Sequence, residues 1–270
     1  MSQPSALINV MTAAAQKAGR KMVRDFSEIE HLQVSKKGPG DFVSNADKKA
    51  EKIIFQELQR ARPKFSFLME ETGEVAGEDS SNRWVIDPID GTTNFLHGIP
   101  HFAISIGLER DGECFAGVIY DPINDQMFWA EKGQGAYLNR RRLRVSGRRD
   151  VTESLFSTGI PFIGADEKDN AVFMRQLTAV ASGSAGVRRF GAASLDLAWV
   201  AAGRYEGFWE AGLCPWDMAA GIIMVREAGG YVTDQQGSKN MMNSGEIVAA
   251  NDSLHAELLA LLRKARKASS

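Results

Sequence analysis

The segment 84–94 holds the strongest candidates for catalytic or ligand-binding residues, and two aspartates stand three residues apart in it. An apolar stretch at 84–86 predicts a short strand that stops at Asp87-Pro88. Asp90 follows, and residues 91–93, Gly-Thr-Thr, predict the start of a helix. Carboxylate oxygens are hard ligands that suit Mg²⁺, and the N–H groups at a helix start favour an anion. The spacing therefore places a candidate metal site and a candidate phosphate site within one turn of chain.

Two further acidic features stand far from this segment in the sequence. Asp217 opens a predicted apolar helix near 216–228, and Glu70-Glu71 follows a predicted strand at 64–69. The residues alone leave other readings open. Asp90 could cap a helix, Asp217 could be a first-turn residue favoured by the helix dipole, and Glu70-Glu71 could be an exposed acidic loop.

The predicted elements that must position these residues change in character near residue 150. Apolar residues at 7, 11, 14, 18 and 22 predict a helix capped by Ser5, and a second helix starts at 44–47 and ends before Pro63. Residues 102–137 predict an antiparallel meander. The second half predicts helices near 169–181, 194–202 and 216–228, strands near 154–157, 206–210 and 246–250, and a last helix capped near Asn251-Asp252. We expect residues 1–150 and 151–270 to form two halves of one compact α/β unit.

The bulk composition excludes several classes of protein. The 270 residues carry a net charge of -2, which provides no global field toward nucleic acid or an acidic membrane. Two cysteines, Cys114 and Cys214, are too few and too far apart for a disulfide framework or a zinc ribbon. No apolar run is long enough to span a bilayer, and the first residues lack the pattern of a signal peptide. We expect a soluble, cytoplasmic protein.

One segment of the chain, 139–149, is strongly basic. A turn followed by an edge strand with solvated arginines is the favoured interpretation, and contact with nucleic acid is the alternative. His97 and His101 follow the acidic segment, and we expect structural or rim roles for both because oxygen ligands already suffice for the metal.

Five motifs in this order resemble the inositol monophosphatase family, and within it the bacterial SuhB-type branch. The resemblance covers nearly the whole chain and implies a layered αβαβα sandwich. Its motifs are the lead-in 41–47, Met69-Glu70-Glu71, the segment 87–94, the segment 189–194, and Pro215-Trp216-Asp217 with 227–230.

The resemblance also implies two or three Mg²⁺ ions. Glu70, Asp87 and the backbone carbonyl of Ile89 would hold one ion, and Asp87, Asp90 and Asp217 a second. A third ion would touch Glu70 and several waters.

The other roles that the resemblance implies concern water, phosphate and the substrate alcohol. Glu70 and Thr92, the latter backed by Asp47, would activate the attacking water, and Lys36 would add positive charge near the site. The N–H groups of Gly91 and Thr92 would hold phosphate oxygens. The residues expected to contact substrate are Asp90, Gly91, Thr92, Arg188, Gly191, Ala192, Ala193, Glu210 and Asp217.

The activity implied is Mg²⁺-dependent hydrolysis of inositol-1-phosphate to inositol and phosphate, with lithium inhibition and a homodimer. The same scaffold serves phosphatases of fructose bisphosphate, histidinol phosphate, NADP and phosphoadenosine nucleotides, so these stay as alternatives. A further alternative is a regulatory protein that contacts RNA or the transcription machinery through Arg140–Arg144.

Overall fold

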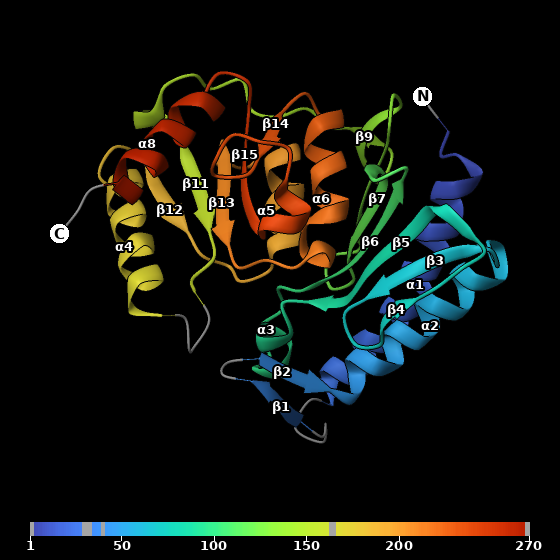
Figure 1. The fold of residues 1–270 in the computed structure, drawn as a ribbon. Helices are drawn as coiled ribbons and strands as arrows, with labels where there is room; N and C mark the ends of the chain where they lie inside the picture. Colours follow the sequence, from blue (N-terminus) through green and yellow to red (C-terminus); the bar gives the residue numbers. More distant parts are fainter. Residues whose placement is uncertain (1–2, 29–33, 39–40, 162–165, 268–270) are drawn as a thin grey trace.

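The chain folds into five stacked layers of alternating helices and strands (Figure 1). The structure is a computed structural model that describes residues 3–28, 34–38, 41–161 and 166–267, with the backbone alone for the two strands between 34 and 44. Two sheets separate three helix pairs, which confirms the predicted αβαβα sandwich. The helix pairs, in layer order, are α1 (Ala6–Ser27) with α2 (Asn45–Ala61), α5 (Ala193–Ala201) with α6 (Pro215–Glu227), and α4 (Glu167–Ala181) with α8 (His255–Lys267).

The larger sheet has eight strands in the order β10-β9-β8-β7-β6-β5-β3-β4. All neighbours are antiparallel except β3 and β5, which run parallel. The run from β5 to β10 confirms the predicted meander. Its strands are β3 (Phe65–Met69), β4 (Gly73–Val75), β5 (Asp79–Asp90), β6 (Ala103–Arg110), β7 (Glu113–Asp121), β8 (Gln126–Glu131), β9 (Gly135–Leu138) and β10 (Arg141–Arg142).

The smaller sheet has five strands in the order β12-β11-β13-β15-β14. The first three run parallel to each other, and β15 is antiparallel to both of its neighbours. The strands are β11 (Leu155–Thr158), β12 (Gly186–Arg188), β13 (Gly207–Ala211), β14 (Tyr231–Thr233) and β15 (Glu246–Ala250). The remaining elements are the hairpin β1 (Val34–Gly38) with β2 (Asp41–Ser44), the short helices α3 (Thr92–Leu96) and α7 (Met241–Ser244), and a 3₁₀ turn at Val151–Glu153.

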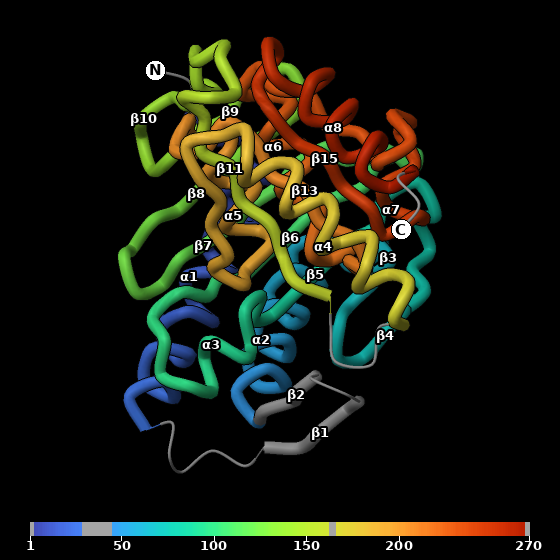
Figure 2. The backbone as a smooth tube through the Cα atoms, turned by 90° about the vertical axis from the view of Figure 1, so that its left-hand side faces the viewer, coloured from blue at the N-terminus to red at the C-terminus, as the bar shows by residue number. Residues whose placement is uncertain are grey.

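The outer helices α1 and α2 lie side by side against the larger sheet (Figure 2). The N–H of Ile8 donates to the Oγ of Ser5 over 3.2 Å, so Ser5 caps α1 as predicted. The apolar residues that predicted α1 are all buried in it. α2 ends at Ala61, two residues before Pro63, because proline disfavours helical backbone in the residue before it.

One predicted boundary near the acidic segment is wrong. β5 is not a short strand that stops at Asp87, because it runs for 12 residues to Asp90. Its pairing with β6 is irregular there: Asp87 faces Ser105 and Asp90 faces Ala103, so β5 holds one extra residue in this interval. That irregularity is a β-bulge, a feature that bends a strand and redirects its side chains.

No helix among the described residues is long and apolar enough to cross a membrane.

The two cysteines differ in accessibility, and this gives a first prediction. Burial raises the pKa of the Cys114 thiol to about 12, with the Glu109 carboxylate adding to the shift. The thiolate is the reactive form, so we expect Cys114 in the native protein to resist alkylation at pH 8, whereas the partly exposed Cys214 reacts. Mass spectrometry after brief iodoacetamide treatment measures this. Rapid labelling of the Cys214→Ser variant without denaturant would contradict it.

Candidate active site

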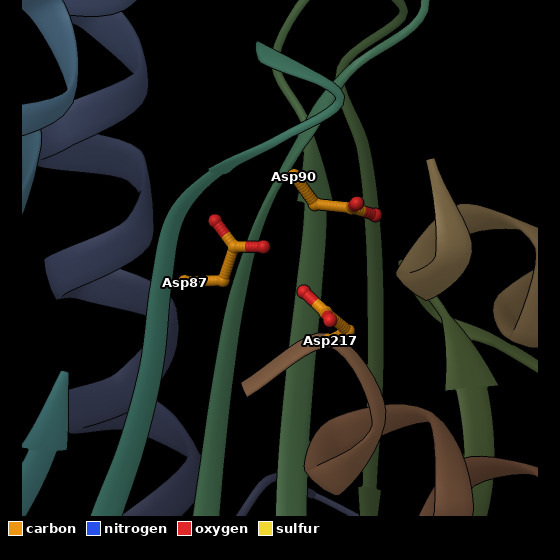
Figure 3. A group of neighbouring side chains, drawn as sticks. All are labelled: Asp87, Asp90 and Asp217. Atoms are coloured by element: carbon orange, nitrogen blue, oxygen red, sulfur yellow. The ribbon is translucent and has the colours of Figure 1, made fainter. Parts of the chain in front are cut away.

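Three aspartates from two distant segments converge at one end of the larger sheet. A carboxylate oxygen from each of Asp87, Asp90 and Asp217 lies within 4.8 Å of the others. The first two come from the end of β5 and the third from the first turn of α6, and their carboxylates point toward one another (Figure 3). Asp87 and Asp90 are buried, and Asp217 is partly exposed. The fold therefore brings together Asp87 and Asp217, which are 130 residues apart along the chain.

The bulge in β5 explains how both of its aspartates reach this point. Residues three apart on a regular strand point to opposite faces of the sheet, because side chains alternate. The extra residue between Asp87 and Asp90 changes this alternation, so both carboxylates face the same pocket.

The Asp217 carboxylate is fixed by the start of its own helix. The backbone N–H of Cys214 donates to Asp217 Oδ2 over 2.7 Å. Pro215 follows in the first helical turn, where a backbone N–H would have no partner within the helix, so proline costs no hydrogen bond there. Asp217 is thus the helix-start residue that its position predicts, and it also faces the acidic cluster.

Asp90 is held by a helix of the second half. The N–H groups of Ser194 and Ala193 donate to its two oxygens over 2.7 and 3.2 Å, and the Ser194 hydroxyl donates as well. Burial raises the pKa of Asp90, and these hydrogen bonds partly offset the effect. The local helix α3 has Gly91 as its N-cap, with a left-handed φ of 90°, so Asp90 does not cap α3.

Asp87 has the most perturbed carboxyl group in the cluster. Its pKa is raised well above the ordinary value, first by burial and then by the charges of Glu70, Asp90 and Asp217. Its Oδ1 is buried and has no hydrogen-bond partner among the described residues. Several carboxylates around one unsatisfied acceptor fit a hard divalent cation, because such a cation neutralises the charge and accepts the oxygen as a ligand.

The cluster lines a pocket with most of the other residues named from the sequence. The predicted residues among its described lining are Glu70, Asp87, Ile89, Asp90, Gly91, Thr92, Gly191, Ala193, Glu210 and Asp217. Asp47 is buried in the first turn of α2 and Ala192 is buried behind the pocket, and neither lines it. The Lys36 side chain lies outside the described residues.

The sequence left Arg188 and Arg189 ambiguous between substrate contact and a dimer surface, and sequence reasoning missed Asp196. Arg189 lines the pocket, and Arg188, the last residue of β12, does not; two adjacent arginines do not reveal this difference in sequence. Asp196, in α5, is buried, and burial followed by the charge of Asp90 raises its pKa well above the ordinary value. The helical period of α5 could have placed Asp196 on a buried face. The sequence of the helix does not predict which charged group lies near this aspartate.

Glu210 lies on the far side of the pocket, in β13. Burial raises its pKa well above the ordinary value, and the charges of Asp196 and Asp90 add to the shift. Gly159 makes room for this side chain: a Cβ built on Gly159 would lie 1.8 Å from Glu210 Oε1. A glycine is therefore required at 159 if Glu210 is to keep its position.

Comparison with known proteins identifies the class to which this fold and site belong. The sequence model of the inositol monophosphatase family matches residues 3–267, so the chain belongs to that family. It is therefore an enzyme that hydrolyses phosphate monoesters.

Three relatives place the chain within the family. It is 55% identical to a protein named inositol-1-monophosphatase from Mesorhizobium japonicum, over 96% of this chain and 97% of the relative. It is 42% identical to a protein named Nus factor SuhB from Escherichia coli, over 95% and 96%. The crystal structure of extragenic suppressor protein suhB from Bartonella henselae superimposes with a TM-score of 0.93 at 55% identity, over 96% and 99%.

Arg189 gives a second prediction because it is the one cationic side chain among the described residues that line the pocket. A charge-assisted hydrogen bond to a phosphate oxygen contributes about 1.5–3 kcal/mol. We therefore expect Arg189→Ala to raise KM for a phosphate monoester by roughly tenfold or more, and Arg188→Ala to leave it within about twofold. Steady-state kinetics on both variants measures this. An equal response from the two arginines would contradict the assignment.

Proposed function

We propose that this chain hydrolyses inositol-1-phosphate to inositol and inorganic phosphate in a Mg²⁺-dependent reaction. The observation that carries the proposal is the convergence of the Asp87, Asp90 and Asp217 carboxylates in a pocket that Glu70 also lines. Two relatives at 55% and 50% identity are named inositol-1-monophosphatase, and these names support the choice of substrate.

The donor set fits Mg²⁺, which prefers carboxylate and carbonyl oxygens and keeps part of its water shell. Glu70, Asp87 and the Ile89 carbonyl would hold one ion, Asp87, Asp90 and Asp217 a second, and Glu70 would contact a third. When bound, Mg²⁺ supplies a water of lowered pKa and stabilises negative charge on the leaving oxygen.

The side chains of the pocket would orient the reactants. Glu70 and Thr92, with Asp47 behind Thr92, would hold the attacking water in line with the phosphorus–oxygen bond, because positioning dominates phosphoryl transfer. The Thr92 hydroxyl now donates to the Ile89 carbonyl over 2.8 Å, beside the aspartates. The N–H groups of Gly91 and Thr92 would bind phosphate oxygens.

The rest of the pocket would recognise the alcohol. Glu210 would hydrogen-bond a hydroxyl of the inositol ring, and the close approach at Gly159 would fix its position. The other proposed substrate contacts are Asp90, Gly191, Ala193 and Asp217, with Arg189 in place of the predicted Arg188. Ala192, which is buried behind the pocket, is left out of this set.

A kinetic panel at saturating Mg²⁺ tests the substrate. We expect a higher kcat/KM with inositol-1-phosphate than with fructose bisphosphate, histidinol phosphate, NADP or phosphoadenosine nucleotides. Inhibition by lithium and a dimer in light scattering are further expectations. If inositol-1-phosphate were the poorest substrate of the panel, the proposed specificity would be wrong.

A second candidate function is a regulatory contact with RNA or the transcription machinery. The observation that favours it is the 42% identity with a relative named Nus factor SuhB. This role predicts that Asp87→Asn abolishes hydrolysis yet keeps the cellular function, whereas charge reversal across Arg140–Arg144 keeps hydrolysis and loses that function.

A further inference from the structure

A groove with a strongly positive lining runs between α1 and α2 on the outer face of the molecule. Ile53 and Gln56 also line it. We call it the α1–α2 cationic groove, and its positive side chains are Lys17, Arg20, Lys21, Arg24, Lys49 and Lys52. The whole chain has a net charge of -2, so this concentration of cations is a local feature.

The spacing along both helices puts the cations on one seam. On α1 the positive residues recur three and four apart, which places them on one face over about 10 Å of helix. α2 runs antiparallel beside α1, because Lys17 pairs with Glu57 over 2.6 Å while Asp25 lies 3.9 Å from Lys49. The helices α1 and α2 lie beside each other (Figure 2), and cations from both of them line the groove.

The groove is under-neutralised. Within the described part of the chain, its ion pairs involve two carboxylates, Glu57 and Asp25, and Asp25 is shared between Lys21 and Lys49. Arg20, Arg24 and Lys52 form no ion pair with any residue that the structure describes. Like charges held this close repel one another, so an external polyanion is the complementary occupant.

We propose that the α1–α2 cationic groove binds the phosphate backbone of single-stranded RNA without reading its sequence. Arginine forks and lysine ammonium groups bind phosphate through charge-assisted hydrogen bonds. Packed helix axes lie only about 8–10 Å apart, so the seam between them fits one strand rather than a duplex. No aromatic side chain is among the described residues that line the groove, so these residues offer the bases no stacking surface and binding is carried by the backbone.

The groove does not fit two other anionic surfaces. Stable contact with a membrane needs apolar side chains that insert, and the lining offers only the half-buried Ile53. An acidic protein segment would need an apolar pocket for an anchoring side chain, and this lining provides none. The proposal does not depend on the phosphatase activity, because α1 and α2, whose side chains line the groove, lie on the opposite face of the larger sheet from α5 and α6 (Figure 1).

Fluorescence anisotropy with a 5′-labelled 15-nucleotide oligouridine in EDTA tests the proposal. Each phosphate contact on a single strand contributes about 0.7 to the slope of log affinity against log salt. With about four contacts, affinity should fall roughly fiftyfold between 50 and 200 mM KCl. The double variant Arg20→Glu/Lys52→Glu should bind at least about tenfold more weakly, with a slope shallower by about 1.4.

The matched control is Lys239→Glu/Lys264→Glu, which makes the same charge change at two exposed lysines outside the groove and should bind as the wild type does. Both variants should keep wild-type hydrolysis and melting temperature, which shows that they fold. Undiminished binding by Arg20→Glu/Lys52→Glu, loss of binding in the control, or preferential displacement of the RNA by phosphatidylserine vesicles or polyglutamate would overturn the proposal.

Discussion

Replacement of Asp87 by asparagine is expected to lower kcat/KM for a phosphate monoester by at least roughly a thousandfold. The substitution keeps the shape of the side chain and removes one negative charge from the centre of the cluster. Asp87 is the carboxylate assigned to both principal metals, so its loss weakens two sites at once. The control is Asp252→Asn, an exposed aspartate that lies outside the pocket and should retain full activity.

The same variant should change stability in the opposite direction when no metal is present. Asp87 is buried beside Glu70, Asp90 and Asp217, and these like charges disfavour its ionised form. Removing that charge relieves repulsion, so metal-free Asp87→Asn should unfold at a temperature equal to or above that of the metal-free wild type.

Addition of Mg²⁺ should then make the wild type unfold at a higher temperature than Asp87→Asn. A ligand that binds only the native state stabilises it by about 2.7 kcal/mol at a hundred times its Kd. The wild type and Asp252→Asn should gain this stabilisation, and Asp87→Asn should lose most of it. Differential scanning fluorimetry after EDTA treatment, with and without Mg²⁺, measures the difference in melting temperature in each condition. A metal-free Asp87→Asn protein that melts well below the wild type, or one that gains as much from Mg²⁺, would contradict the assignment of the cluster.

The acidic core of the site could be predicted from sequence because its signals are local. An apolar strand followed by Asp87, Asp90 and a glycine, and Asp217 after Pro215, each specify a short piece of backbone with an acidic side chain at its end. The family resemblance then joined these pieces. The residues alone could not do so, because Asp90 and Asp217 each had an equally local interpretation as a helix-start residue.

The geometry between the pieces was beyond the sequence. Nothing in residues 87–90 announces that β5 continues through the proline with an extra residue, yet this bulge puts two aspartates on one face. The choice between Arg188 and Arg189 depends on where β12 ends relative to the pocket. Asp90 binds the start of α5, more than 100 residues away, and no local pattern predicts that contact.

The long elements of the fold could be predicted from sequence, and its shortest strands could not. Long amphipathic helices and the hairpins of the meander have clear periods, so α1, α2, α8 and β6 to β8 lie close to their predicted positions. β12 and β14, of three residues each, are too short to show a period, and they are strands only because they pair with β11 and β15. Tertiary pairing, which no window of sequence contains, decided these elements.

Two glycines determine how closely the helix that carries Asp217 approaches the larger sheet. Gly107 in β6 and Gly117 in β7 are paired directly across the strands, and both face α6. A Cβ on Gly117 would lie 2.6 Å from the Ala220 carbonyl oxygen and 2.7 Å from Ala220 Cα. The pair therefore forms a shallow trough without side chains in which the first turns of α6 rest.

Gly117→Ala is accordingly expected to destabilise the protein and to damage its activity together. The atoms that a new methyl group meets are backbone, so α6 itself must move, and overpacking of this kind costs about 1–3 kcal/mol. That cost should lower the melting temperature by several degrees, at about 2–4 °C per kcal/mol. Asp217 lies one turn before Ala220, and misplacement of a catalytic group by about 1 Å can cost a hundredfold in rate.

Gly147→Ala is the matched control, because a Cβ at Gly147 has nothing within 4 Å. It should be neutral or slightly stabilising, since alanine restricts the unfolded chain more than glycine does. Thermal melts and the Mg²⁺ dependence of hydrolysis separate the two effects: a shifted α6 raises the Mg²⁺ concentration needed for half-maximal rate, whereas a loss of stability alone leaves it unchanged. A Gly117→Ala protein with wild-type melting and wild-type Mg²⁺ response would show that α6 does not depend on the trough for its position.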